Sequence, residues 1–232
     1  MPLQATQIVS LATQIAKCPG FTSQAGQLLN VVLQELCETY DFEVARKTFL
    51  FNFDLGQNSG LGPFPLPADY LRAKKDDVYF TISGQPYMMI PVDQSEFDSF
   101  TLTAGIQGYP AYMTTDMNVS PPTMSVWPPA SGAYPVTVKY YAAMPDIVTP
   151  ETSTSIPWFP FSNYLVTRLS AELMKITDDE RQAKFNVDSE DLLRKYLEMK
   201  DDPEGTVNTV SLDRRRFGTP FSRLPNTKLL GW

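Results

Sequence analysis

Residues 19–36, PGFTSQAGQLLNVVLQEL, hold the signals that decide the fold of the N-terminal region. Pro19 and Gly20 end any helix that precedes them, and Thr22 and Ser23 are favourable N-cap residues for a helix that follows. Apolar residues then recur at the spacing of one helix face, at Ala25, Leu28, Leu29, Val32, Leu33 and Leu36. The same period precedes the turn, at Ala5, Ile8, Leu11, Ala12 and Ile15. The pattern predicts two short helices in an αα-hairpin, neither of which is long enough to be stable alone in water.

The middle of the chain, residues 43–150, differs from the N-terminal region in composition and in hydrophobic pattern. Fifteen of the twenty prolines lie between Pro63 and Pro160, and such a density excludes long helices. Short strand patterns lie between turn signals, at residues 48–53, 78–82, 87–90, 111–114, 124–127 and 136–141. Segment 56–67 is too rich in glycine and proline for regular structure. The region therefore predicts a compact antiparallel β unit of about five or six strands.

Helical periodicity returns after Pro160. One apolar stripe runs along Phe161, Leu165, Leu169, Leu173 and Ile176, and a second runs along Val187, Leu192, Leu193, Tyr196 and Leu197. We therefore predict an α+β fold, with a four-helix bundle formed by residues 1–42 and 151–204 and an antiparallel β domain, residues 43–150, inserted in it. Residues 205–232 match no periodic pattern and are expected to form an extended C-terminal tail.

The C-terminal tail, residues 205–232, differs from the rest of the chain in charge. It carries five basic residues and one acidic residue, a balance of +4, so residues 1–204 carry −11 of the total of −7. Large apolar side chains alternate with the basic ones, which favours docking into a groove of an acidic partner protein. Contact with nucleic-acid phosphates and a merely solvated cluster are the alternatives. The candidate docking residues are Arg214, Arg215, Arg216, Phe217, Phe221, Arg223, Leu224, Leu229, Leu230 and Trp232.

The sequence offers little for catalysis. It has no histidine, which removes most zinc sites, every Ser–His–Asp arrangement and the commonest general base at neutral pH. The acid pairs 76–77, 178–179 and 201–202 are adjacent residues, whose side chains diverge instead of facing each other across a cleft. The loop Gly60-Leu61-Gly62 lacks the lysine of a phosphate-binding loop. We therefore expect no enzyme, with no catalytic residue, no cofactor and no metal site.

The cysteines, the net charge and the N-terminus set further expectations. Cys18 and Cys37 both fall in predicted helices; a disulfide between them stays open, and two buried free thiols are the plainer interpretation. A net charge of −7 argues against a protein that mainly coats nucleic acid. The sequence shows neither a signal peptide nor a membrane span, so we expect a soluble protein made in a reducing cytoplasm.

Several short motifs occur in an order that is similar to that of one family. They are a strand after Arg46-Lys47, PLPADYLR at residues 65–72, GYPAY at 108–112, VTVKYY at 136–141 and a helix entry at 154–157. Together, over about residues 5–200, they resemble the head-to-tail adaptor proteins of short-tailed bacteriophages, also called connector or tail tubular proteins. LPADYLR is the most distinctive single piece.

The resemblance implies an assembly protein of the virion and not an enzyme. Members of that family form a homo-oligomeric ring, usually of twelve copies, below the portal ring of the capsid, with the β unit towards the tail nozzle. In several relatives a C-terminal extension contacts the portal protein, which is the partner that the candidate docking residues would meet. The resemblance also implies that DNA passes through the ring lumen without specific binding and that no membrane takes part. The protein would be made in the host cytoplasm and reside at the head-tail junction of the virion.

Two other classes of function fit parts of the sequence. The aromatic residues and turns of the β unit would suit a receptor- or polysaccharide-binding module of a phage tail fibre or spike, which would need neither the flanking helices nor the tail. A hydrolase that uses carboxylates alone would need two acids that converge in one pocket, and the sequence shows no such pair.

Overall fold

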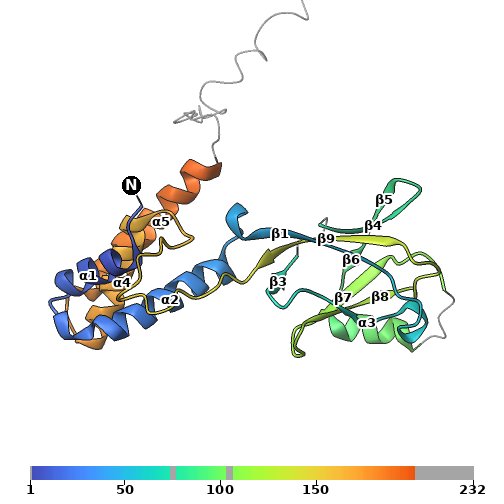
Figure 1. Cartoon of the computed structure of the whole chain (residues 1–232), viewed down its shortest axis with the longest axis horizontal. Coiled ribbons are helices and arrows are strands. Elements are labelled where there is room, and N and C mark those ends of the chain that lie inside the picture. The colour runs from blue at the N-terminus through green and yellow to red at the C-terminus, as the bar shows by residue number, and fades with distance from the viewer. Residues whose placement is uncertain (1, 74–76, 103–106, 202–232) are drawn as a thin grey trace, which may run out of the picture.

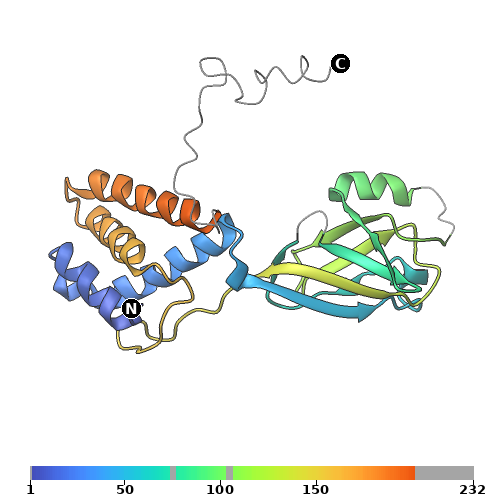
Figure 2. The same ribbon diagram turned by 90° about the horizontal axis from the view of Figure 1, so that it is seen from above.

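The computed structural model describes residues 2–73, 77–102 and 107–201. Most of the α-helices gather at one end of the molecule, and two β-sheets with one short helix lie at the other (Figure 1); the view from above shows the same arrangement (Figure 2). The α-helices are α1 (Ala5–Ile15), α2 (Thr22–Thr39), α3 (Gln94–Thr101), α4 (Ser162–Ile176) and α5 (Gln182–Asp201). Short 3₁₀ turns lie at Pro19–Phe21, Glu43–Ala45 and Asn58–Gly60.

Helix α4 is the centre of the helical unit. It packs against α1, α2 and α5, and its residues Leu165, Leu169 and Leu173 are fully buried. These side chains share one hydrophobic core with the buried stripes of the αα-hairpin. The apolar stripe of α4 extends beyond this core, because its last residue, Ile176, is 52% exposed.

The strands form two sheets that enclose a second core. The first sheet is antiparallel and consists of β1 (Arg46–Asn52), β3 (Tyr70–Arg72), β4 (Val78–Ile82), β5 (Gln85–Met88) and β9 (Pro135–Ala142). Its order is β1–β9–β4–β5, and β3 also pairs with β9. The second sheet consists of β2 (Phe64–Pro65), β6 (Ile90–Pro91), β7 (Tyr112–Asp116) and β8 (Thr123–Trp127), in the order β2–β8–β7–β6. Phe53, Phe64 and Phe80 are among the largest buried side chains of this core.

The structure corrects the predicted fold class. The chain is α+β, but the predicted four-helix bundle is wrong, because the described residues form five α-helices and nine strands in two sheets. The additional helix, α3, lies in the β unit against β7 and β8. A helix fits there because residues 92–109 contain no proline, and Glu96 lies in its first turn, where the helix dipole favours an acidic side chain.

The strands also differ from the sequence pattern in detail. The pattern predicts neither β2, which lies in segment 56–67, nor β3, because strands of two or three residues show no alternation. The predicted strand 87–90 covers the end of β5 and Ile90 of β6, which are separate strands in the structure. Strand β6 pairs with β7 in parallel, where only antiparallel pairing is expected from the sequence. The hairpin from β4 to β5 turns at Ser83 and Gly84, which both have positive φ (50° and 82°), as a two-residue hairpin turn of this kind requires.

Candidate functional site at the joint of the two units

The motif LPADYLR, residues 66–72, lies where the helical unit meets the β unit. Leu66 is buried, and its N–H donates a hydrogen bond to the carbonyl oxygen of Pro122 at 2.8 Å. The N–H of Tyr70 donates to the carbonyl oxygen of Pro67 at 3.0 Å, which closes a turn and starts β3 beside β9. We call the residues that link the two units here, together with those that tie the neighbouring strands to one another, the joint. Its members are Cys37, Asp41, Ala45, Arg46, Lys47, Asp69, Tyr70, Arg72, Asp77, Tyr140 and Tyr141.

Arg72 connects β3 to the C-terminal end of α2. Its Nε donates to Asp41 Oδ1 at 3.0 Å, and its Nη1 and Nη2 donate to the carbonyl oxygens of Glu38 and Tyr40 at 2.7 and 3.0 Å. Its guanidinium carbon lies 5.6 Å from the ring centroid of Tyr141. Carbonyl groups in the last turn of a helix have no partner within the helix and form the negative end of its dipole. A single cation therefore binds two carbonyl oxygens at the end of α2 and ties this helix to the sheet.

Asp69 links β1 to β9. Its Oδ1 accepts a hydrogen bond from the hydroxyl of Tyr140 at 2.9 Å, and its Oδ2 lies 2.5 Å from Lys47 Nζ. Partial burial opposes the charged form, but the hydrogen bonds from Lys47 and Tyr140 hold the pKa of Asp69 below its usual value. Burial, followed by the hydrogen bond to Asp69, raises the pKa of Tyr140 to about 12. At neutral pH the two groups are therefore a carboxylate and a neutral phenol in a structural contact.

A second ion pair holds the start of β4. Arg46 Nη2 lies 2.8 Å from Asp77 Oδ1, and the nearby carboxylate raises the pKa of the Arg46 guanidinium. Asp77 is buried, and its carbonyl oxygen accepts a hydrogen bond from the N–H of Lys139 at 2.8 Å. Asp77, from the acid pair 76–77, thus connects β4 with β1 and β9.

Apolar contacts complete the joint. Three buried and three partly buried residues pack in one cluster: Cys37, Ala45, Tyr141, Leu71, Met144 and Trp158. The thiol of Cys37 donates to the carbonyl oxygen of Ala142 at 3.2 Å. Both cysteines are free and buried, and burial raises the pKa of the Cys18 thiol. The structure therefore contains no disulfide between Cys18 and Cys37.

The segment 143–161, which we call the strap, returns from β9 to α4 and holds the αα-hairpin. The N–H of Ala5 donates to the carbonyl oxygen of Ser155 at 2.9 Å, which satisfies a free donor in the first turn of α1. The side-chain amide of Asn30 on α2 makes two hydrogen bonds with the backbone of Ile147, at 3.0 and 3.1 Å. The strap thus contacts both helices of the hairpin.

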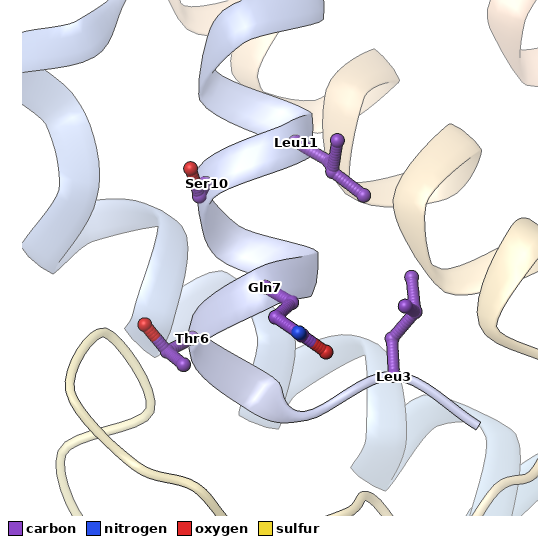
Figure 3. Close-up of a pocket in the computed structure, with 5 residues that line it drawn as sticks. All are labelled: Leu3, Thr6, Gln7, Ser10 and Leu11. Carbon is purple, nitrogen blue, oxygen red and sulfur yellow. The ribbon is translucent and has the colours of Figure 1, made fainter. Parts of the chain in front are cut away.

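An open cavity of about 420 Å³ lies on the exposed side of α1 (Figure 3). It is lined by Leu3, Thr6, Gln7, Ser10 and Leu11. Figure 3 shows Leu3, Gln7 and Leu11 on one side of the helix and Thr6 and Ser10 on the other. The lining has amide, hydroxyl and aliphatic groups and no charge, which suits contact with another protein surface better than chemistry on a substrate.

Three tyrosines, which we call the tyrosine cluster, gather at edge strand β5: Tyr87, Tyr109 and Tyr134. The ring of Tyr87 stacks on Phe80, with 5.5 Å between centroids, and on Tyr109, with 6.3 Å. Tyr109 lies 5.8 Å from Tyr134. Tyr87 and Tyr109 are 45% and 59% exposed. An exposed aromatic surface of this kind can receive apolar or planar groups of a partner.

The other acidic residues and the helices bear on two further kinds of site, a metal centre and a membrane span. Asp179 pairs with Arg181 at 2.6 Å, and hydrogen bonds from Arg181 lower the pKa of Asp179 to about 2. Asp76 and Asp202, from the other acid pairs, lie outside the described residues. Within the described ranges, no three cysteine or acidic side chains gather where they could hold a metal ion. No helix in that part of the chain is both long and apolar enough to cross a membrane.

All ten docking residues predicted from the sequence lie outside the described residues. They are Arg214, Arg215, Arg216, Phe217, Phe221, Arg223, Leu224, Leu229, Leu230 and Trp232. Their role stays a prediction. The joint, in contrast, is not identified by the sequence pattern, because Arg72 and Asp69 bind Asp41 and Tyr140, which are 31 and 71 positions away. The available signal is the mixture of charged and aromatic residues in 69–72.

A family model described as SU10 adaptor protein matches residues 4–214. No curated protein matches the chain. The matched range contains both units, the strap and the whole of the joint.

Proposed function

The chain belongs to the SU10 adaptor protein family, and we propose that it forms a ring below the portal that joins the capsid to the tail nozzle. The family is one of structural phage adaptors, found in the virion. Twelve copies is the ring size that the resemblance implies. In this proposal the protein is made in the host cytoplasm, and viral DNA passes through the ring during packaging and ejection.

The joint is the observation that carries this proposal. An adaptor holds two partners at fixed positions, so its two ends must not move freely relative to each other. Arg72 ties the sheet to α2, and Asp69 and Asp77 tie the neighbouring strands to one another. A connected network of hydrogen bonds and ion pairs of this kind restricts the motion of the elements that it joins. The family match and the joint thus support the same role.

The end-to-end arrangement of the two units (Figure 2) provides separate surfaces for separate partners. We assign the tail nozzle to the β domain, residues 43–150, and its tyrosine cluster. We assign the portal protein to the tail, residues 205–232, whose charge of +4 would meet an acidic groove. The helical parts of the copies, residues 1–42 and 151–204, would then pack side by side around the ring.

The net charge of −7 supports a channel that DNA crosses without specific binding, because a repulsive wall does not hold a polyanion. A ring lumen lined mostly by basic residues would contradict this part of the proposal. The acids of the joint are engaged in ion pairs and hydrogen bonds, so we propose no catalytic activity for them.

The tyrosine cluster favours one alternative, a receptor- or polysaccharide-binding module of a phage tail fibre or spike. Two exposed, stacked tyrosines could hold the flat face of a sugar ring. That alternative gives no role to the helical unit or to the joint. Binding of a polysaccharide, lost in Tyr109→Ala, would favour it.

The mass of the purified full-length protein in solution tests the proposal. Light scattering is measured on the protein alone and mixed with the portal ring of its virion. We expect the mixture to contain about twelve copies of the chain per portal ring. A stable trimer that does not bind the portal would contradict the adaptor proposal and favour the fibre or spike.

A further inference from the structure

One part of the helical unit is almost free of charge. Residues 2–34 contain one charged side chain, Lys17, and residues 147–167 contain one, Glu151. In the whole chain, 19% of the residues are charged. The two segments are far apart in the sequence, but the strap brings them together through the two hydrogen bonds between Asn30 and Ile147.

These segments form a continuous surface, which we call the neutral face: the exposed side chains of α1, of α2 up to Gln34, and of strap residues 147–161. The strap lies close to α2, because a Cβ added at Gly26 would be 3.5 Å from Pro150 and 2.7 Å from the Glu151 carboxylate. On α1, the hydroxyl of Thr6 donates to the carbonyl oxygen of Glu151 at 3.0 Å. The cavity on α1 therefore adjoins the strap.

Apolar side chains protrude from the neutral face. Val31 on α2 is 56% exposed, and Val148 and Ile156 on the strap are 81% and 56% exposed. Val31 and Val148 directly follow the bonded residues Asn30 and Ile147, so they flank the same contact. A second cavity, of about 390 Å³, lies beside Val148 and Ile156.

The charge of the chain indicates which partner such a face fits. Copies that each carry −7 repel one another, and the repulsion is smallest between surfaces that carry few charges. Glu151 is the one charged residue of the neutral face. Glutamine, serine and threonine can form hydrogen bonds across an interface without removing a charge from water. Interface cores are depleted of charged residues for the same reason.

We propose that the neutral face is the contact between neighbouring copies of this chain. This inference rests on the proposed ring. In a ring each copy contributes two different patches, and the neutral face offers both an open cavity, on α1, and protruding side chains, on the strap and α2.

The substitution Val31→Glu tests the inference, with Val187→Glu as the matched control. Both valines lie on helices and are similarly exposed, at 56% and 59%, but Val187 on α5 is outside the neutral face. The mass of each full-length variant is measured against concentration, alone and with the portal ring. We expect the wild type and Val187→Glu to assemble alike. Val31→Glu should lose about a hundredfold or more in association, because its charge would be buried without a partner. A second variant, Val148→Glu, should behave like Val31→Glu.

Salt provides an independent readout. Because the copies repel each other over long range, raising the salt from about 50 to about 500 mM should leave assembly unchanged or strengthen it. A contact formed by opposite charges would weaken over the same range.

The outcomes separate this inference from the proposed function. If Val31→Glu and Val148→Glu assemble like the wild type, the neutral face is not the contact, and the adaptor proposal is unaffected. If Val31→Glu still self-associates but loses the portal, the face binds the portal and the inference is wrong. If the wild type forms no ring, alone or with the portal, both the ring and the inference are wrong.

Discussion

Arg72 on β3 and Asp41, just beyond the end of α2, meet across the joint, with Arg72 Nε 3.0 Å from Asp41 Oδ1. The same guanidinium binds two carbonyl oxygens at the end of the helix. One residue of the β unit therefore makes three hydrogen bonds to the helical unit. These three bonds hold the end of α2 against β3, beside the apolar contacts of Cys37, Ala45 and Tyr141.

Replacement Arg72→Ala should destabilise the protein by about 1–3 kcal/mol, because it removes three charge-assisted hydrogen bonds that water partly screens. Arg72→Lys should recover only part of the loss, since an ammonium group has no planar fork. Urea unfolding measures both effects. The matched control is Arg194→Ala, whose ion pair with Asp191 is 66% and 50% exposed and should contribute less than about 0.5 kcal/mol. Equal losses in Arg72→Ala and Arg194→Ala would contradict a special role for Arg72.

Asp69→Asn should lower stability at neutral pH and lose that effect in acid. The folded state holds the pKa of Asp69 below its ordinary value of 3.8, so the unfolded chain takes up the proton first as the pH falls. The stabilisation by the carboxylate is complete above the unfolded pKa and disappears as the pH falls through the folded one. The difference in unfolding free energy between wild type and Asp69→Asn should therefore shrink from about pH 5 to about pH 3.

Chemical unfolding at a series of pH values measures this difference. Tyr140→Phe is the control, because it removes the hydroxyl and retains the ion pair between Asp69 and Lys47. It should keep most of the acid dependence of the wild type. A difference between wild type and Asp69→Asn that stays constant from neutral pH to pH 3 would rule out a contribution from the charge of Asp69.

Gly60→Ala should destabilise the β unit by about 1–3 kcal/mol. Gly60 has a φ of 89°, and an added Cβ would lie 2.5 Å from the carbonyl oxygen of Ala130. The turn around Gly60 therefore packs closely against the connection between β8 and β9, where Ala130 lies. This close approach explains the glycine-rich sequence without a bound phosphate. Gly20→Ala is the control, because a Cβ there would meet nothing within 4 Å, and it should change stability by less than about 0.5 kcal/mol. Thermal melts of the two variants that coincide would contradict this explanation.

The elements that can be predicted from the sequence are those long enough to show a complete period of the hydrophobic pattern. The stripe in residues 22–36 corresponds to α2, with Leu29, Val32 and Leu33 buried. The strand pattern 78–82 corresponds to β4 residue for residue. In both segments the local pattern and the packing agree, so tertiary contacts have nothing to override.

The features that do not follow from the sequence depend on contacts between distant residues. Helix α3 is short, and its formation depends on the sheet it covers. The stripe through Ile176 is regular, but nothing in the sequence shows that the core ends before it. The joint pairs Asp69 with Tyr140 only because β3 and β9 are neighbours. The resemblance to the adaptor family points to the motifs that contain Asp69 and Tyr140, but only the pairing of the strands shows that the two residues are partners.

Deletion of residues 205–232 should leave the fold intact and remove attachment to the portal. No member of the hydrophobic cores of the described residues lies beyond Leu197, so the truncated chain keeps both cores. Its urea midpoint should equal that of the full chain. Co-sedimentation with the portal ring should show loss of binding.

Two triple variants of Arg214, Arg215 and Arg216 separate charge from geometry in the tail. Replacement by alanine should weaken portal binding most at low salt, because salt screens the attraction that the arginines contribute. Replacement by lysine keeps the charge but removes the planar fork that binds carboxylates in pairs, so a loss seen in both variants would identify bidentate contacts. Lysine variants that bind like the wild type would show that charge alone is sufficient. Full-strength binding of the truncated chain would show that another part of the protein anchors it to the portal.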